Sequence, residues 1–181
     1  EYVRIHGMEN AEGMDRIFRK RVRRADYVAE YQHVYDANKV LFKGQPAVPF
    51  TFKDITGKEV SLSDLKGKYV YIDVWATWCG PCNAEIPHLK KLEEEFEGRN
   101  ICFVSISCDD SRNAWERFVQ VKQLGGVQLH MGGDKSFMEA IRCKGIPRFL
   151  LIDQDGKFLN ANMSRPSDGK TLEILNTLPG L

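Results

Sequence analysis

The sequence predicts an α/β fold in which helices cover a layered, mixed sheet. Segments rich in β-branched and aromatic residues alternate with capped helical segments, which is the pattern of parallel strands joined by crossover helices. The last two strand-like segments, at 148–153 and 157–163, flank a Gln-Asp-Gly turn and indicate an antiparallel hairpin. The sequence contains no internal repeat and no low-complexity tract that would compete with this interpretation.

The expected elements follow one another in a regular order. Residues 50–62 alternate apolar and polar side chains around Thr56-Gly57, which is typical of a short β-hairpin. Ser63 or Asp64 could then cap a brief helical turn that ends before Gly67. The other expected elements are strands at 69–76, 100–108 and 127–131, and helices at 81–97, 111–125, 134–145 and 167–178.

The N-terminal stretch differs from the rest of the chain. From about residue 8 to residue 42, apolar side chains recur at three- and four-residue steps without a proline, which predicts helix. The basic run at 16–24 is surrounded by acidic residues, which favours a solvated helix face over a nucleic-acid or membrane patch. Glycine and prolines at 43–52 indicate a linker. We therefore expect a helical extension or linker at 1–43, the tail of a preceding region, and a second unit at 44–181.

Composition excludes several classes of protein. The 181 residues carry a net charge of +1, which gives no sign of binding to nucleic acid or to an anionic membrane surface. The apolar run at 149–152 is too short to span a bilayer. Five thinly spread cysteines do not make a small disulfide scaffold. Three of them, Cys102, Cys108 and Cys143, are expected to be buried and inert.

The segment W-A-T-W-C-G-P-C at residues 75–82 carries the clearest chemical signal. Its cysteines, Cys79 and Cys82, lie where a buried strand should meet a helix. At that helix N-terminus, unpaired N–H groups and the helix dipole favour a thiolate and lower the pKa of Cys79. Cys82, one turn further on, is expected to be more covered. This asymmetry suits dithiol exchange, in which Cys79 attacks a partner disulfide and Cys82 resolves the mixed disulfide.

Two other uses of the pair find little support. A structural zinc site needs four ligands, usually two such pairs, but the sequence has no second C-x-x-C and its four histidines are scattered, with only His88 nearby. A purely structural disulfide across so short a span would constrain the unfolded chain only weakly. We therefore expect no metal and no cofactor other than the redox-active pair itself.

Two segments carry a resemblance to thioredoxin-fold oxidoreductases. The first, D-V-W-A-T-W-C-G-P-C at residues 73–82, resembles their active-site stretch. The second, G-I-P-R-F-L-L-I-D-Q-D-G at residues 145–156, resembles the segment that carries their cis-proline loop. The resemblance implies that Pro147 is cis and faces the cysteines, and that the Ile146 backbone is free to pair with an extended substrate strand.

Three further features are similar to the TlpA/ResA-like branch of that fold. They are the N-terminal hairpin, the A-E-I-P-H-L continuation at residues 84–89, and the extra helix and strand at about 111–131. The resemblance covers roughly residues 44–181. It implies a thioredoxin-like three-layer α/β/α fold with a mixed central sheet, an N-terminal β-hairpin and a helical N-terminal extension.

Asp73 lies six residues before Cys79, on the predicted strand. By resemblance to thioredoxin, it is a largely buried carboxylate beneath the pair that accepts or returns the proton of Cys82, and burial would raise its pKa. Many members of the TlpA/ResA-like branch have no acid here, so this position departs toward the thioredoxin pattern. The alternative is an aspartate at a strand end that forms only local hydrogen bonds.

Other residues near the pair have less defined roles. The surface on which a partner docks is expected to comprise Trp78, Gly80, Pro81 and the Ile146 backbone. Glu85 either perturbs the pair or is a solvated helix carboxylate. Arg148 either steers acidic partners or forms a surface salt bridge. Cys143 is either a third thiol near the active face or a small buried side chain on a helix.

The resemblance implies a thiol–disulfide oxidoreductase, and the Gly-Pro dipeptide between the cysteines resembles the reducing members of the superfamily. It further implies a disulfide-bearing protein substrate and an upstream thiol electron donor that is membrane-bound in many such systems. The implied setting is periplasmic or otherwise extracytoplasmic, with tethering through an N-terminal region missing from this sequence. Two alternatives stay open: a thiol peroxidase, and a redox-inert docking or metal-chaperone domain of the same fold.

Overall fold

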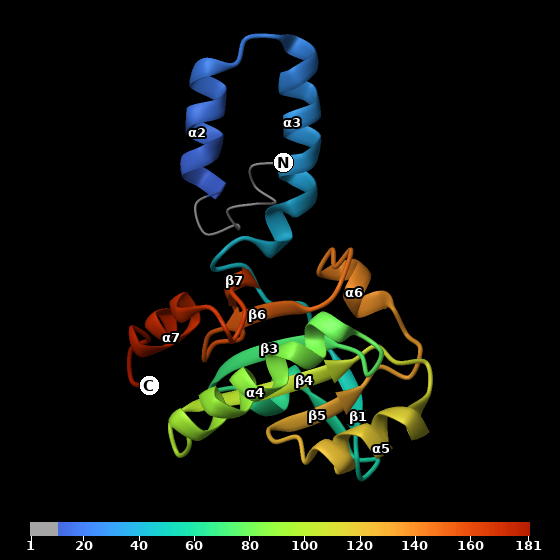
Figure 1. Cartoon of the computed structure of the whole chain (residues 1–181). Coiled ribbons are helices and arrows are strands. Elements are labelled where there is room, and N and C mark those ends of the chain that lie inside the picture. Colours follow the sequence, from blue (N-terminus) through green and yellow to red (C-terminus); the bar gives the residue numbers. More distant parts are fainter. Residues whose placement is uncertain (1–10) are drawn as a thin grey trace.

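The computed structural model describes residues 11–181 of the protein (Figure 1). Within this range, seven strands form one sheet: β1 (Thr51–Asp54), β2 (Glu59–Ser61), β3 (Tyr69–Trp75), β4 (Ile101–Ser107), β5 (Val127–His130), β6 (Arg148–Ile152) and β7 (Phe158–Met163). Their order across the sheet is β2-β1-β5-β4-β3-β6-β7. The three central strands β5, β4 and β3 run parallel, and the outer strands pair antiparallel. The sheet is therefore mixed, as the sequence predicted.

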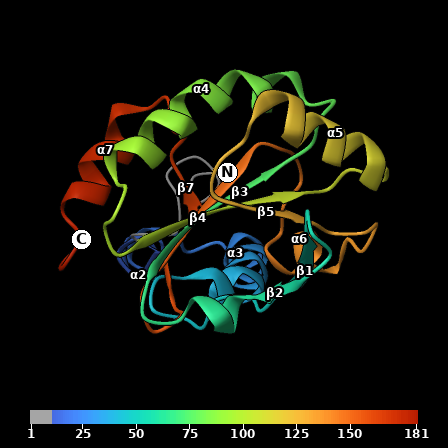
Figure 2. The same cartoon turned by 90° about the horizontal axis from the view of Figure 1, so that it is seen from below.

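Helices cover both faces of this sheet (Figure 2). The helices are α2 (Ala11–Arg21), α3 (Ala25–Asn38), α4 (Gly80–Glu95), α5 (Arg112–Lys122), α6 (Ser136–Ala140) and α7 (Gly169–Asn176), with 3-10 turns η1 (Lys39–Leu41) and η2 (Leu62–Leu65). On one face, Tyr71 of β3 packs in a core with Leu92 of α4 and Leu175 of α7. On the other face, Ile72 packs in a core with Leu41 of η1 and Phe137 of α6. These contacts confirm the predicted three-layer α/β/α architecture.

Strand β3 leads into the Cys79–Cys82 pair, and every one of its residues is buried. A strand covered on both faces reads as a nearly continuous apolar run, and Y-V-Y-I-D-V-W departs from this only at Asp73. Asp73 pairs with Ser105 of β4 on one side and with Phe149 of β6 on the other. Because side chains alternate along a strand, Asp73 lies on the same face as Tyr71 and Trp75, under α4.

The predicted N-terminal β-hairpin is confirmed. Strands β1 and β2 pair antiparallel, and β1 also pairs with β5, with Lys53 opposite His130. The helical turn after β2 is present, but its cap differs from the prediction. The Asp64 carboxylate accepts a hydrogen bond from the backbone N–H of Ser61 at 2.8 Å, so Ser61 is the capping position and Asp64 its third-residue partner.

The N-terminal helical region consists of two helices rather than one. Helices α2 and α3 form a hairpin that projects from the sheet-containing body (Figure 1). The chain turns between them because apolar side chains of the two helices pack on each other: the Phe18 and Tyr31 rings stack with centroids 3.8 Å apart. The first predicted residues of this region, 8–10, lie outside the described residues. The division into a unit at 1–43 and a unit at 44–181 stays a prediction.

Two helices, α5 and α6, end at least three residues earlier than predicted. Helix α5 ends at Lys122 because Gln123, not a glycine, takes the left-handed conformation that stops it. Helix α6 ends at Ala140, and Arg142 is left-handed with φ 50°. Cys143 therefore lies in a loop rather than on a helix. Among residues 11–181, no helix combines the length and the apolar character that crossing a bilayer requires.

Candidate active site

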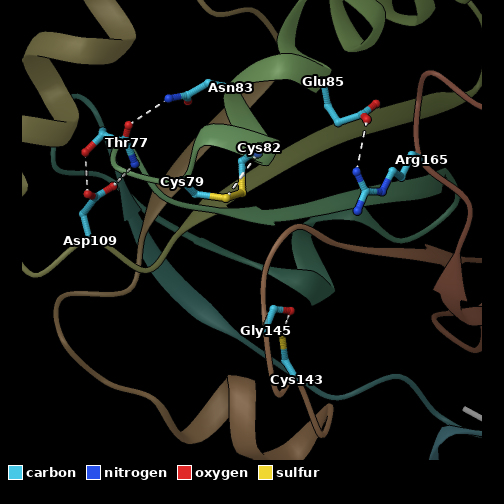
Figure 3. The surroundings of a disulfide bond; sticks show 9 residues. All are labelled: Thr77, Cys79, Cys82, Asn83, Glu85, Asp109, Cys143, Gly145 and Arg165. Atoms are coloured by element: carbon cyan, nitrogen blue, oxygen red, sulfur yellow. Dashed lines mark hydrogen bonds and ion pairs between the residues drawn. A yellow bond between two sulfur atoms is a disulfide. The ribbon is translucent and has the colours of Figure 1, made fainter.

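Cys79 and Cys82 form a disulfide at the N-terminus of α4, with their Cα atoms 5.2 Å apart (Figure 3). Cys79 is the residue that caps the helix, and its Sγ accepts the backbone N–H of Cys82 at 3.2 Å. Pro81 fits the first turn of the helix, where its missing N–H has no intrahelical partner to lose. A donor aimed at Cys79 Sγ stabilises negative charge on that sulfur once the disulfide is reduced.

The expected difference in cover between the two cysteines does not appear in this oxidised pair. Cys79 is 5% exposed and Cys82 is 4% exposed. Both pack in one cluster with Trp75, Trp115 and, at its edge, Ile146. The asymmetry between the cysteines lies instead in the hydrogen bond, because the sulfur of Cys79 is the one that receives a helix N–H.

Asp109, which was not expected from the sequence, fixes the loop that leads into the pair. Its carboxylate accepts the Thr77 N–H at 2.9 Å and the Thr77 hydroxyl at 2.6 Å, and a third bond comes from the Ser107 hydroxyl at 2.7 Å. The Asn83 side-chain amide then donates to the Thr77 carbonyl at 3.0 Å (Figure 3). This network ties the end of β4 to the start of α4. The signal in the sequence was an acid directly after a buried strand, at the edge of the sheet where the pair lies.

An exposed rim surrounds the buried disulfide. Trp78 is 70% exposed, and Gly80 and Pro81 are also exposed. The Ile146–Pro147 peptide bond is cis, and Ile146 packs against the same cluster that holds the two cysteines. The residues expected from the sequence to form a docking surface thus lie together around the pair, whereas Trp75 belongs to the core.

Asp73 is a buried acid on β3, under α4. It is 8% exposed, and its Oδ1 has no hydrogen-bond partner within the part of the chain that the structure describes. Burial, and after it the charges of Glu85 and Glu93, raise its pKa from 3.8 to about 8. With this pKa, most of the Asp73 carboxyl groups are protonated at neutral pH and a smaller fraction is ionised.

Glu85 is not the solvated carboxylate that one interpretation of the sequence allowed. It is 7% exposed, and its two oxygens accept the N–H and the hydroxyl of Ser167, each at 3.0 Å. Arg165 forms an ion pair with it at 3.7 Å (Figure 3). Glu85 thus joins α4 to the connection between β7 and α7, and its charge adds to the raised pKa of Asp73.

Neither interpretation of Arg148 describes its position. Its guanidinium is partly buried and donates to the Ala161 carbonyl, with Nε at 2.9 Å, rather than to a carboxylate. Burial lowers its pKa. The side chain therefore braces strand β6 against β7 and is not free to steer acidic partners.

The three remaining thiols are half-buried rather than buried. Burial raises the pKa of each one. The Cys143 thiol donates to the Gly145 carbonyl at 3.2 Å (Figure 3). A raised pKa keeps a thiol protonated and therefore unreactive at neutral pH. Between residues 11 and 181, no group of three or more His, Cys, Asp or Glu side chains is arranged to hold a metal ion, and His6 lies outside that range.

Comparisons with known proteins bear on this geometry. A family model described as the AhpC/TSA family matches residues 43–160. The chain belongs to this family. It is 31% identical over 133 residues to the thiol-disulfide oxidoreductase ResA of Bacillus cereus, covering 71% of this chain and 74% of that protein. It is 27% identical over 152 residues to ResA of Bacillus subtilis, covering 83% and 84%.

Solved structures agree with these relatives. A solution structure of a candidate thiol-disulfide oxidoreductase from Bacteroides vulgatus is 60% identical with a TM-score of 0.68, covering 74% of this chain and 88% of that one. A candidate thiol:disulfide interchange protein DsbE from Chlorobium tepidum is 30% identical with a TM-score of 0.67, covering 75% and 97%. The predicted thioredoxin-like fold and TlpA/ResA-like membership are therefore confirmed. The chain is a thiol–disulfide oxidoreductase of the AhpC/TSA family.

Proposed function

We propose that this oxidoreductase reduces disulfides of partner proteins by dithiol exchange at Cys79 and Cys82. The observation that carries the proposal is the placement of the pair at the N-terminus of α4, with Cys79 Sγ accepting the Cys82 N–H. The helix N-terminus and this N–H donor would stabilise a thiolate on Cys79 in the reduced protein, which supports Cys79 as the nucleophile.

In the first step, the Cys79 thiolate attacks one sulfur of the partner disulfide. A Cys79–partner disulfide forms, and the other partner sulfur leaves with the electron pair of the broken bond and takes a proton from water. The partner docks on the exposed rim of Trp78, Gly80 and Pro81, and its extended strand pairs with the Ile146 backbone. Main-chain pairing gives affinity that does not depend on the side chains of the partner strand.

In the second step, Asp73 takes the proton of the Cys82 thiol in the fraction of molecules in which its carboxyl group is ionised. The Cys82 thiolate then attacks Cys79 Sγ, and the partner leaves as a second thiolate. When a thiol donor reopens the Cys79–Cys82 bond, Asp73 returns its proton to Cys82. An acid–base group works best when its pKa lies near the working pH, and a value of about 8 meets this condition.

The Gly-Pro dipeptide between the cysteines supports reduction over oxidation as the direction of this exchange. By resemblance, the proposal extends to a thiol electron donor upstream, bound to a membrane, and to an extracytoplasmic setting. The thiol peroxidase has less support, because that chemistry needs an arginine and a hydroxyl around one cysteine with the resolving cysteine elsewhere. Here both cysteines share one helix start, and Arg148 is bound to the Ala161 carbonyl.

Reduction of insulin with dithiothreitol as the donor tests the proposal. The wild-type protein should accelerate the reaction, and the Cys79→Ser variant should lose all of that acceleration. Cys143→Ser is the matched control, since it removes a thiol outside the pair and should keep the wild-type rate. Retained activity in Cys79→Ser would refute the mechanism. Consumption of hydrogen peroxide at a rate above that of insulin reduction would favour the peroxidase instead.

A further inference from the structure

We propose that Glu93 is a second acid of this site, which shares a buried polar cavity with Asp73 and exchanges the Asp73 proton with solvent. The inference rests on the proposed function, in which Asp73 takes and returns the proton of Cys82. Glu93 acts through Asp73 and does not touch the reacting sulfurs, so it is a positioning residue rather than a catalytic one.

The cavity lies beneath α4 and has a volume of about 10 Å³. Its polar lining residues are Asp73, Trp75, Lys90, Glu93, Ser105 and Gln128. Three buried polar atoms of this lining, Asp73 Oδ1, Trp75 Nε1 and Gln128 Oε1, have no hydrogen-bond partner among the described residues. Buried polar atoms without a partner are uncommon and call for an explanation. A volume of about 10 Å³ is the smallest that can hold one water molecule. Such a water would donate hydrogen bonds to the two oxygens and accept one from the indole N–H.

The backbone beside the cavity is shaped around the Glu93 carboxyl group. A Cβ atom on Gly125 would lie 2.5 Å from Glu93 Oε2, and one on Gly126 would lie 2.8 Å from Oε1. Real Cβ atoms do not come so close to another heavy atom, so the two glycines leave the space that the carboxyl group fills. Gln128 Nε2 donates to the Gly125 carbonyl at 2.7 Å, which fixes the side-chain amide and leaves its oxygen unpaired.

Electrostatics couple the two acids. Burial raises the pKa of Glu93 from 4.5 to about 7, with Lys90 lowering it and Glu94 raising it further. On the other side, the charges of Glu85 and Glu93 add to burial in raising the pKa of Asp73. Two carboxyl groups that share one site do not ionise independently, and the second proton leaves at a higher pH than the first. The pair therefore holds a proton near neutral pH.

Each step of the proposed proton transfer accounts for the proton and for the electron pair of Cys82. When Cys82 resolves a mixed disulfide, its proton moves to the Asp73 carboxylate while the electron pair of the Cys82 thiolate forms the new S–S bond. Asp73 then passes the proton through the cavity to Glu93, which is only partly buried and releases it to water. Reopening of the disulfide by a donor thiol runs the same path in reverse. No bond to sulfur forms or breaks at Glu93.

The test is a titration of the Asp73 side-chain carboxyl carbon by ¹³C NMR, in the oxidised full chain. Glu93→Gln removes the neighbouring charge, so the Asp73 midpoint should move to lower pH by about one pH unit. Glu95→Gln is the matched control, because it removes the same charge from an exposed position of the same helix and should leave the midpoint in place. An equal midpoint in wild type, Glu93→Gln and Glu95→Gln would overturn the inference.

A second variant keeps every titratable group. Gly125→Ala pushes the Glu93 carboxyl group out of the cavity, and the group that must move is the end of a flexible side chain. The Asp73 midpoint should again move to lower pH, with the fold unchanged by circular dichroism. If the Asp73 midpoint does not move in a folded Gly125→Ala protein, the space at Gly125 does not hold the Glu93 carboxyl group in the cavity, and the inference is overturned.

A kinetic measurement separates this inference from the proposed function. The rate of insulin reduction between pH 6 and pH 9 should depend on Asp73, and its pH profile should move to lower pH in Glu93→Gln. If Asp73→Asn keeps the wild-type profile, the proton-transfer role in the proposed function fails, and Glu93 has no proton to relay. If Asp73→Asn slows reduction but Glu93→Gln leaves both the profile and the NMR midpoint unchanged, the inference alone fails.

Discussion

Replacing Asp73 by Asn should stabilise the oxidised protein at pH 7 and have less effect as the pH falls. The pKa of the carboxyl group rises from 3.8 to about 8 on folding, mainly because it is buried. Between these values the folded protein holds a proton that the unfolded chain has released. Stability therefore falls as the pH rises from about 4 to about 8, and the stabilising contribution is complete only below pH 4. Asparagine has the same shape but no proton to lose, so its contribution is constant.

The size of the effect follows from the same shift. Each pH unit in that window costs about 1.4 kcal/mol of unfolding free energy, so the interval from pH 4 to pH 7 costs about 4 kcal/mol. This is an upper bound, because Glu93 titrates in the same cavity and takes up part of the change. Between pH 5 and pH 7, the advantage of the Asn variant should grow by up to about 3 kcal/mol.

Urea unfolding followed by circular dichroism measures this difference at pH 5 and pH 7. Comparing Asp73→Asn with wild type at each pH cancels the groups that titrate alike in both proteins. Asp110→Asn, which removes an exposed carboxylate, is the control and should show the same small effect at both values. An advantage of Asp73→Asn that is equal at pH 5 and pH 7 would refute the argument that Asp73 keeps its proton in the folded protein.

The remaining predictions concern two other residues. Glu85→Gln should lower the pH at which Asp73 titrates in NMR. It should also lower the free energy of unfolding in urea by about 1–3 kcal/mol, because Ser167 loses a charged acceptor. An unmoved Asp73 titration would show that Glu85 acts only on structure. Trp78→Ala should leave the unfolding midpoint in place, since the side chain is 70% exposed, and should raise KM for insulin several-fold. An unchanged KM would remove Trp78 from the docking surface.

The sequence predicted the elements whose signal is local. Fewer than ten neighbouring residues were enough to predict three of them: the strand at 69–76, the helix that starts after Cys79 and the hairpin around Thr56-Gly57. The structure has β3, α4 and the β1–β2 hairpin at these places. Helix ends were less predictable. Gln123 and Arg142 adopt left-handed conformations that glycine usually takes, and no composition signal marks them in advance.

The surroundings of the acids could not be predicted, because their partners are distant in sequence. The sequence left open whether Glu85 is a solvated helix carboxylate or perturbs the pair, because its hydrogen-bond partner Ser167 is 82 residues further along the chain. Glu93 lies in a mostly charged stretch at 90–95, and such a stretch usually indicates a solvated helix face. Gly125 and Gly126, which leave the space that this carboxyl group fills, come after β4 and α5 in the sequence.

The most direct test of the mechanism is to locate the first covalent bond it forms. The reduced Cys82→Ser variant should react with insulin to give a mixed disulfide that persists without the resolving thiol, and peptide mass mapping should place that disulfide at Cys79. One adduct per protein is expected at this position. An adduct mapped to Cys102, Cys108 or Cys143, or no adduct although the variant is folded, would contradict the assignment of Cys79 as the nucleophile.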